Sequence, residues 1–259
     1  MRVPQAGQRV HISHSQVEEY LQCPKRYYLH RIERLPPDFM PSGLLFGTAI
    51  HEAIACYHQG RLEGKVASPE EMHVTFETAW ASQHLPVRYS RGESGQSLSA
   101  LARSLLRAFL AHPHHAGDVL AVEEPFALEL STSLPPVHGR IDLVESASEG
   151  ALGVTDFKTS KGNTEPEPEQ LVLYREAVRA LGYPGADHVS ARFVVLVKTQ
   201  EPEIVVYTPE IGPDHLPRLI RRYEEAWQAI QSERAFYARP DSWCRGCQWQ
   251  RHCDAYTPR

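Results

Sequence analysis

The chain has 259 residues, of which 42% are hydrophobic and 23% charged, as in ordinary folded globular proteins. The formal net charge of −5 argues against a protein that binds nucleic acid through overall positive charge alone, but it allows a local basic groove or a bound metal ion. No apolar run approaches the roughly 20 residues that span a bilayer, and the first residues lack the apolar region of a signal peptide, so we expect a cytoplasmic protein.

The first half of the chain is predicted to be mainly helical. Ser15 followed by Glu18 is a capping-box pattern that predicts a helix start, and Pro24 should end that helix just after Cys23 because proline has no N–H to donate. Apolar residues then recur at helical spacing in three further segments. These segments are 47–61, 70–83 and 97–111.

The middle of the chain changes to the period of two that is typical of strands. Strands are predicted at 118–130, 137–145, 152–158, 191–198 and 203–208, with a helix at 168–181 and a long helix at 214–236. We therefore expect an α/β (α+β) fold in which a mixed β-sheet is flanked by helices and preceded by a helical N-terminal segment.

Acidic residues lie near the ends of two predicted neighbouring strands. Asp142 ends G-R-I-D, and Asp156 and Lys158 lie in D-F-K, where side chains two apart project to the same face of a strand. Two neighbouring carboxylates repel each other unless a cation lies between them, and oxygen ligands suit Mg²⁺ or Mn²⁺. Such an ion would polarise a phosphodiester and help to ionise water, while the lysine stabilises the developing charge. By itself, Asp-x-Lys is more often a polar strand end with a surface lysine.

Two further motifs accompany these residues. His51 lies beside Ile50 on a predicted helix, where an imidazole could add a nitrogen ligand to the same metal ion. Gln170 and Tyr174 are four residues apart on the helix after the lysine strand, so they share one helix face, where an amide and a phenol could contact a phosphate or a base. Taken alone, either motif is more often structural.

Together and in this order, G-x-x-x-H-E, G-R-I-D, D-F-K-T and Q-x-x-x-Y resemble the nuclease domain of the PD-(D/E)XK superfamily, in its RecB-type branch. The resemblance runs from about residue 15 to 253 and implies a restriction-endonuclease-like sheet. It also implies a metal site and a catalytic lysine with a supporting motif. The metal ligands would be His51, Asp142, Asp156 and the Phe157 carbonyl, the catalytic lysine Lys158, and the supporting pair Gln170 and Tyr174.

The cysteines predict a second site. Three of the five lie near the end of the sequence in a C-x2-C-x5-C pattern, at Cys244, Cys247 and Cys253. A closed tetrahedral or cubane site needs a fourth ligand, and a reducing compartment disfavours disulfides. The candidates are Cys23, Cys56 and, for zinc, His252. Cys56 otherwise fits a small buried hydrophobic residue on its helix.

RecB-type relatives with an iron–sulfur cluster, such as AddB-type helicase–nuclease subunits and iron–sulfur CRISPR-associated exonucleases, carry one N-terminal and three C-terminal cysteines. The resemblance therefore implies Cys23 as the fourth ligand and a structural [4Fe–4S] cluster, with Zn²⁺ as the alternative at the same cysteines. Basic and aromatic residues would gather there and suit single-stranded DNA, or the tryptophans would only shield the cluster. They are Arg26, Arg31, Arg245, Arg251, Trp243 and Trp249.

We expect one PD-(D/E)XK nuclease domain over 1–259, with a helical part at 13–115, a nuclease core at 116–236 and a cluster-binding segment at 237–259 that closes onto Cys23. The expected activity is Mg²⁺- or Mn²⁺-dependent DNA hydrolysis, more exonucleolytic than endonucleolytic, on single strands in DNA repair, recombination or CRISPR spacer acquisition. Because the sequence lacks a G-x-x-x-x-G-K-[ST] motif, duplex processing would need a partner such as a helicase. In spacer acquisition the partner would be a CRISPR integrase. The alternative is a non-catalytic DNA-binding or scaffold protein of a helicase–nuclease or integrase complex.

Overall fold

The computed structural model describes residues 11–112, 117–147 and 150–255. Its first elements are α1 (His14–Gln22), α2 (Pro24–Tyr27), the π-helical turn η1 (Tyr28–Ile32), β1 (Met40–Pro41), α3 (Ser42–Leu62), α4 (Pro69–Ala81), β2 (Val87–Arg88) and α5 (Gly95–Ala111). The sheet region follows with β3 (Val119–Leu128), β4 (Val137–Ser146), β5 (Leu152–Ser160), α6 (Glu169–Ala180), β6 (Val189–Val197) and β7 (Glu203–Tyr207). The last elements are α7 (His215–Ser232) and the 3₁₀ turns η3 (Ser242–Gly246) and η4 (Gln250–His252).

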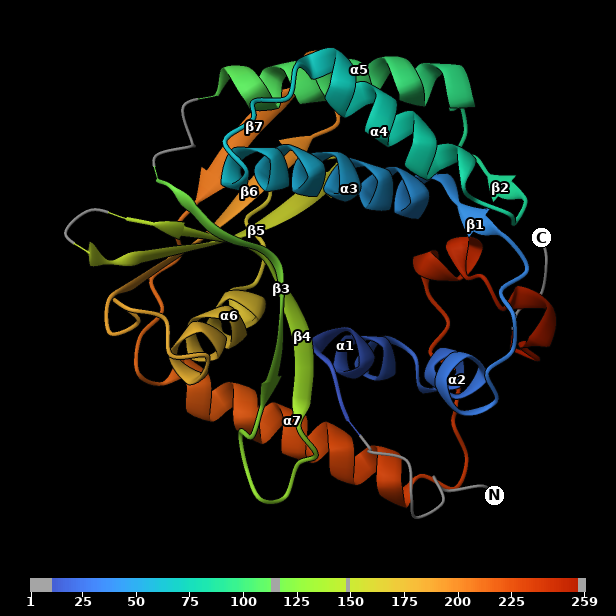
Figure 1. Cartoon of the computed structure of the whole chain (residues 1–259). Helices are drawn as coiled ribbons and strands as arrows, with labels where there is room; N and C mark the ends of the chain where they lie inside the picture. Colours follow the sequence, from blue (N-terminus) through green and yellow to red (C-terminus); the bar gives the residue numbers. More distant parts are fainter. Residues whose placement is uncertain (1–10, 113–116, 148–149, 256–259) are drawn as a thin grey trace.

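The main sheet has five strands in the order β3-β4-β5-β6-β7. Neighbouring strands are antiparallel except β5 and β6, which are parallel and are joined by the crossover helix α6. The helices α3, α4 and α5 lie on one side of the sheet, and α6 and α7 lie on the other (Figure 1). The predicted mixed sheet flanked by helices is therefore confirmed.

The sheet separates two hydrophobic cores. Fully buried Phe46, Phe76 and Phe109 pack under α3 to α5 together with Phe157 of β5. Because side chains alternate along a strand, the neighbours of Phe157 on either side project toward the α6 face instead. This alternation puts the side chains of Asp156 and Lys158 on the α6 side of the sheet.

Helix α1 begins at a different residue from the predicted one. The hydroxyl of Ser13 accepts a hydrogen bond from the Gln16 backbone N–H at 3.3 Å, so Ser13 is the N-cap and the predicted capping box at Ser15 and Glu18 is wrong. Ser13 and Gln16 have the same S-x-x-Q spacing, which is equally compatible with a capping box. Pro24 follows the end of α1, as predicted, and then occupies the first position of α2, where a missing N–H breaks no helical hydrogen bond.

Two other helix ends differ from the predicted ones by four residues or more. Helix α3 begins at Ser42, five residues before 47. Helix α7 ends at Ser232 instead of 236, because Phe236 packs against Tyr20, Tyr27 and Tyr28 with ring centroids 5.1 to 6.5 Å apart. The end of the expected helical part, 113–115, lies outside the described residues.

The segment after α7 returns to the first helices of the chain, as the red ribbon beside α2 shows in Figure 1. Backbone hydrogen bonds join Lys25 N to Tyr237 O at 3.2 Å and Asp38 N to Gln248 O at 2.8 Å. The Gln248 side-chain amide also donates to Phe39 O at 3.1 Å. Residues more than two hundred positions apart are thereby brought together. None of the helices in the described part of the chain is long and apolar enough to cross a membrane.

Candidate functional site

Strands β4 and β5 separate at the two acidic residues. Their pairing runs from Ser146↔Leu152 to Leu143↔Thr155 and stops before Asp142 and Asp156. Beyond that point the Phe157 backbone N–H donates to Asp142 Oδ2 at 2.9 Å. A carboxylate thus accepts the hydrogen bond that a backbone carbonyl of β4 would accept in a regular sheet. The two strands therefore diverge where they carry the two carboxylates.

The two carboxylates share one hydroxyl donor. The Tyr174 hydroxyl oxygen lies 3.1 Å from Asp156 Oδ1 and 3.3 Å from Asp142 Oδ1, and a phenol has a single proton to donate. Asp156 is only 1% exposed. Burial, together with the nearby Asp156 charge, raises the pKa of Asp142 to about 8. Without a cation, the folded protein therefore disfavours two negative charges at this place.

Lys158 is held beside the carboxylates. Its ammonium donates to Gln170 Oε1 at 2.7 Å and lies 2.7 Å from Asp156 Oδ2, while the Gln170 amide donates to the Tyr174 hydroxyl at 3.0 Å. The contact between Lys158 and Asp156 is an ion pair without hydrogen-bond geometry, and within the described residues the buried Asp156 Oδ2 accepts no hydrogen bond. Asp156 Oδ2 thus has the Lys158 ammonium as its partner, and two neighbouring carboxylates fit the oxygen-rich coordination that Mg²⁺ and Mn²⁺ prefer.

His51 approaches the same place from α3. Its Nδ1 lies 3.6 Å from Asp142 Oδ2. Burial lowers the pKa of His51, which favours the neutral imidazole that binds metal ions. The fold thus brings together the side chains of His51 from α3, Asp142 from β4, Asp156 and Lys158 from β5, and Gln170 and Tyr174 from α6.

The side chains of Gln170 and Tyr174 contact other residues of the site, whereas we expected them to contact a phosphate or a base. Tyr174 is 1% exposed, so its phenol cannot reach a bound substrate, and Gln170 is occupied by Lys158 and Tyr174. These two residues orient the carboxylates and the lysine instead. Helical spacing correctly put them on one face, but it could not indicate that this face packs against the strand ends.

Sequence reasoning missed Glu123 of β3. It lies between Val122 and Glu124, whose partners Leu143 and Ile141 flank Asp142 on β4. Its backbone has φ of 52°, which is rare for a residue other than glycine. Its carboxylate lies 3.6 Å from the Arg140 guanidinium, and its negative charge adds to the effects that raise the pKa of Asp142. The available signal was the Glu123-Glu124 pair, which interrupts the alternating apolar pattern of the strand.

A model of the PD-(D/E)XK nuclease superfamily matches residues 11–254. The chain belongs to the PD-(D/E)XK nuclease superfamily. Nucleases of this superfamily use divalent metal ions. Among solved structures, a protein from Eubacterium rectale described as a "Putative exonuclease" matches with a TM-score of 0.58 and 11% identity, over 100% of this chain and 96% of that chain. This likeness shows a shared fold.

A second solved structure, SSO0001, matches with a TM-score of 0.38 and 14% identity over 94% of each chain, a likeness too weak to support a conclusion. No curated protein matches this superfamily member.

Another group of metal-type ligands lies near this nuclease site. His14, Glu18 and Glu169 have ligand atoms within 4.8 Å of one another, the one such group of three or more His, Cys, Asp or Glu residues in the described ranges. Arg222 already pairs with both carboxylates, and the Tyr223 hydroxyl lies 2.8 Å from His14 Nδ1. A guanidinium therefore supplies the positive charge there.

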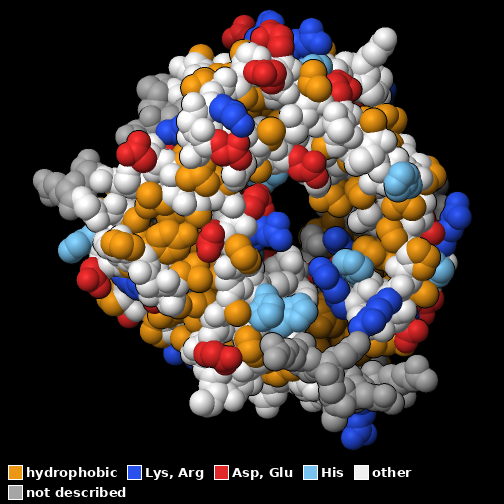
Figure 2. Space-filling view, in the orientation of Figure 1, with side chains coloured by type: hydrophobic (Ala, Val, Ile, Leu, Met, Phe, Trp, Pro, Cys, Tyr) orange, Lys and Arg blue, Asp and Glu red, His pale blue; other side chains and the backbone are white. Residues whose placement is uncertain are grey.

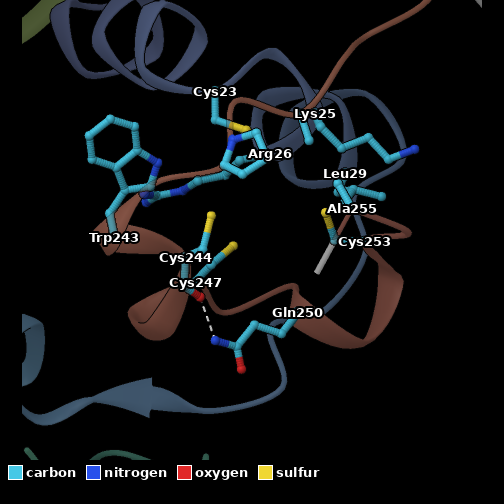
Figure 3. Close-up of a pocket in the computed structure, with 12 residues that line it drawn as sticks. Cys23, Lys25, Arg26, Leu29, Trp243, Cys244, Cys247, Gln250, Cys253 and Ala255 are labelled. Atoms are coloured by element: carbon cyan, nitrogen blue, oxygen red, sulfur yellow. Dashed lines mark hydrogen bonds between the residues drawn. The ribbon is translucent and has the colours of Figure 1, made fainter. Parts of the chain in front are cut away.

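The superfamily member also has a cavity that four cysteines line. Cys23 ends α1, and Cys244, Cys247 and Cys253 come from the last segment; Figure 3 shows their side chains around one space. Cys56 is exposed on α3 and is not among the lining residues, so the expectation of a buried hydrophobic role for it is wrong. Of the two N-terminal cysteines, Cys23 therefore lies with the three terminal cysteines and Cys56 does not. The spacing of the cysteines in the sequence did not distinguish between them.

The four sulfurs are spread around the cavity. In the described part of the chain, the cysteines form no group of three with sulfurs within 4.8 Å of one another. Four thiolates around a single Zn²⁺, with bonds of about 2.3 Å, would place their sulfurs about 3.8 Å apart. Four thiols around one cavity are a donor set that suits either Zn²⁺ or an iron–sulfur cluster. Burial raises the pKa of the Cys247 thiol, and the nearby Arg26 opposes this effect.

The two tryptophans of the last segment have different environments. Trp249 is 2% exposed, donates from its indole nitrogen to Leu35 O at 2.9 Å and stacks on His30 with ring centroids 4.5 Å apart. It cannot stack on a DNA base. Trp243 is 39% exposed and lines the cysteine cavity.

Proposed function

We propose that this chain is a Mg²⁺- or Mn²⁺-dependent deoxyribonuclease of the RecB-type branch that degrades single-stranded DNA from an end. The observation that carries the proposal is the pair of carboxylates, partly buried Asp142 and fully buried Asp156, with one shared hydroxyl donor and Lys158 beside them. One lysine does not balance two neighbouring carboxylates, so the arrangement is suited to holding a metal ion as well.

In this proposal Asp142, Asp156, His51 and the Phe157 carbonyl hold the divalent ion. When bound, the ion polarises the phosphodiester and lowers the pKa of a water ligand. Lys158 stabilises the negative charge that develops on the phosphate, because its ammonium lies beside Asp156 and its side chain is 36% exposed. The remaining two residues of the motif keep this lysine and the carboxylates in position.

The test is cleavage of 5′- and 3′-labelled single-stranded DNA with Mn²⁺. We expect Asp156→Asn and Lys158→Ala to lower the rate by about a hundredfold or more. Matched controls are Asp118→Asn, at an exposed position before β3, and Lys161→Ala, a 70% exposed lysine just after β5. Equal rates for wild type, Asp156→Asn and Lys158→Ala would refute the catalytic assignment and favour the non-catalytic DNA-binding or scaffold alternative.

Attack from an end of a single strand is supported by three observations. The motifs resemble the RecB-type branch, and the E. rectale neighbour carries exonuclease in its description. Figure 2 also shows a hollow in this face, with acidic, basic and histidine side chains at its rim, where Figure 1 has α3, β4 and α1. Circular single-stranded DNA should resist degradation if this is correct, and its cleavage would indicate an endonuclease. A helicase, or an integrase in CRISPR spacer acquisition, is the proposed partner.

We further propose that Cys23, Cys244, Cys247 and Cys253 hold a [4Fe–4S] cluster, so that segment 237–259 closes onto the start of a single nuclease domain. Anaerobically purified protein should be brown and contain about four iron and four sulfide per chain. Cys23→Ser should lose both, whereas the matched variant Cys56→Ser should retain them because Cys56 lies away from the cavity. Stoichiometric zinc without iron would replace the cluster with the zinc alternative.

A further inference from the structure

Arg26 is a cationic residue of the cysteine cavity. It lies in α2, three residues after Cys23, and lines the cavity together with all four cysteines (Figure 3). Its Nε donates to Glu19 Oε1 at 3.1 Å and its Nη1 donates to Gln22 Oε1 at 3.1 Å. The guanidinium also lies 5.8 Å from the centroid of the Trp249 ring. These contacts keep its charge at one wall of the cavity.

The charges around Arg26 do not balance. The side chain of Glu19 is 5% exposed and has three cationic or basic partners: Arg26 at 3.1 Å, Arg31 at 2.8 Å and His30 at 2.8 Å. One carboxylate between two guanidiniums leaves one positive charge without a partner within this group. The neighbouring Lys25 is different, because its ammonium pairs with Asp254 at 3.4 Å.

We propose that Arg26, positioned by Glu19, offsets the negative charge of the metal–thiolate group that the four cysteines hold. The inference rests on the cysteine ligand set of the proposed function. Four thiolates around a [4Fe–4S]²⁺ core, or around one Zn²⁺, carry two net negative charges in either case. Partial burial of this charge is costly unless a cation lies nearby, and Arg26 is the cavity residue with positive charge in excess of its carboxylate partner.

Two measurable effects follow. Reduction of an iron–sulfur cluster adds a further negative charge, so a neighbouring guanidinium stabilises the reduced form more than the oxidised form and raises the reduction potential. The same charge stabilises thiolates against protonation and so slows the loss of metal to a chelator. Neither effect requires nuclease activity.

The experiment compares the full chain with Arg26→Gln, Arg26→Lys and Lys25→Gln after anaerobic purification. An optical redox titration measures the midpoint potential, and transfer of metal to a coloured chelator measures release. We expect Arg26→Gln to have a more negative potential and to release metal on the order of tenfold faster. Arg26→Lys, which keeps the charge, and Lys25→Gln, which removes the cation paired with Asp254, should remain close to wild type.

Other results would contradict the role of Arg26 or the cysteine ligand set. If wild type binds a cluster and Arg26→Gln matches it in potential and release, Arg26 does not offset the charge. If Arg26→Lys is altered as much as Arg26→Gln, the residue acts through packing on Trp249 and the inference is wrong. If wild type binds zinc, the release rate alone decides by the same comparison. If wild type holds neither metal, the cysteine ligand set itself is refuted and the inference falls with it.

Discussion

Replacement of Asp142 by Asn should stabilise the metal-free protein. Burial and the nearby Asp156 charge raise the pKa of Asp142 from 3.8 to about 8, so between these pH values the folded state keeps a proton that the unfolded state releases. This linkage lowers stability as pH rises from 3.8 toward 8, by about 1.4 kcal/mol for each pH unit. The whole interval corresponds to roughly 5 kcal/mol.

Asparagine avoids this loss because it has no charge to bury. Its amide oxygen can still accept from the Phe157 N–H, but its NH₂ group needs a new acceptor near Tyr174. We therefore expect Asp142→Asn to be more stable than wild type by about 2 to 4 kcal/mol at pH 8, after the cost of placing that amide. The difference should shrink toward pH 5.

Urea unfolding followed by tryptophan fluorescence, in EDTA at pH 5.5, 6.5, 7.5 and 8, measures the difference in free energy of unfolding between Asp142→Asn and wild type. Asp118→Asn, at an exposed position, is the control and should match wild type throughout. Addition of Mn²⁺ should stabilise wild type more than Asp142→Asn. A variant that is no more stable than wild type at pH 8, or a difference that does not grow with pH, would refute the reasoning.

Three other experiments test further features of the structure. Tyr174→Phe removes the hydroxyl shared by the two carboxylates and should weaken Mn²⁺ binding by about 10- to 100-fold, measured by titration calorimetry; unchanged affinity would contradict a supporting role. Glu123→Gly should exceed Glu123→Ala in stability by about 1 kcal/mol in urea unfolding because glycine tolerates its φ of 52°, and equal stability would show that this backbone is unstrained. Ser13→Ala should cost about 1 kcal/mol of stability and Ser15→Ala almost nothing, whereas the reverse order would restore the capping box predicted from sequence.

Local geometry made part of the candidate site predictable. Side chains two apart on a strand share a face, which put Asp156 and Lys158 together, and side chains four apart on a helix did the same for Gln170 and Tyr174. The alternation and helical periods likewise predicted the mixed sheet and its flanking helices. These features depend on covalent spacing and backbone period, which are present in any linear sequence.

The ends of elements and the environment of each motif were not predictable in this way. Helix α7 ends before the predicted residue because Phe236 packs against three tyrosines from the start of the chain. No local sequence pattern predicts that contact. Glu123 lies near Asp142 only because β3 and β4 pair in a register that joins Val122 to Leu143 and Glu124 to Ile141.

The sequence by itself determined which chemical groups this protein carries, their order, and the faces that neighbouring groups share. Only the tertiary structure decided that Tyr174 is buried between two carboxylates, and that Cys23 but not Cys56 lines the cavity of the three terminal cysteines. The physical reason is that burial, charge and cavity lining arise where distant segments pack, so they depend on contacts between residues that no local spacing relates.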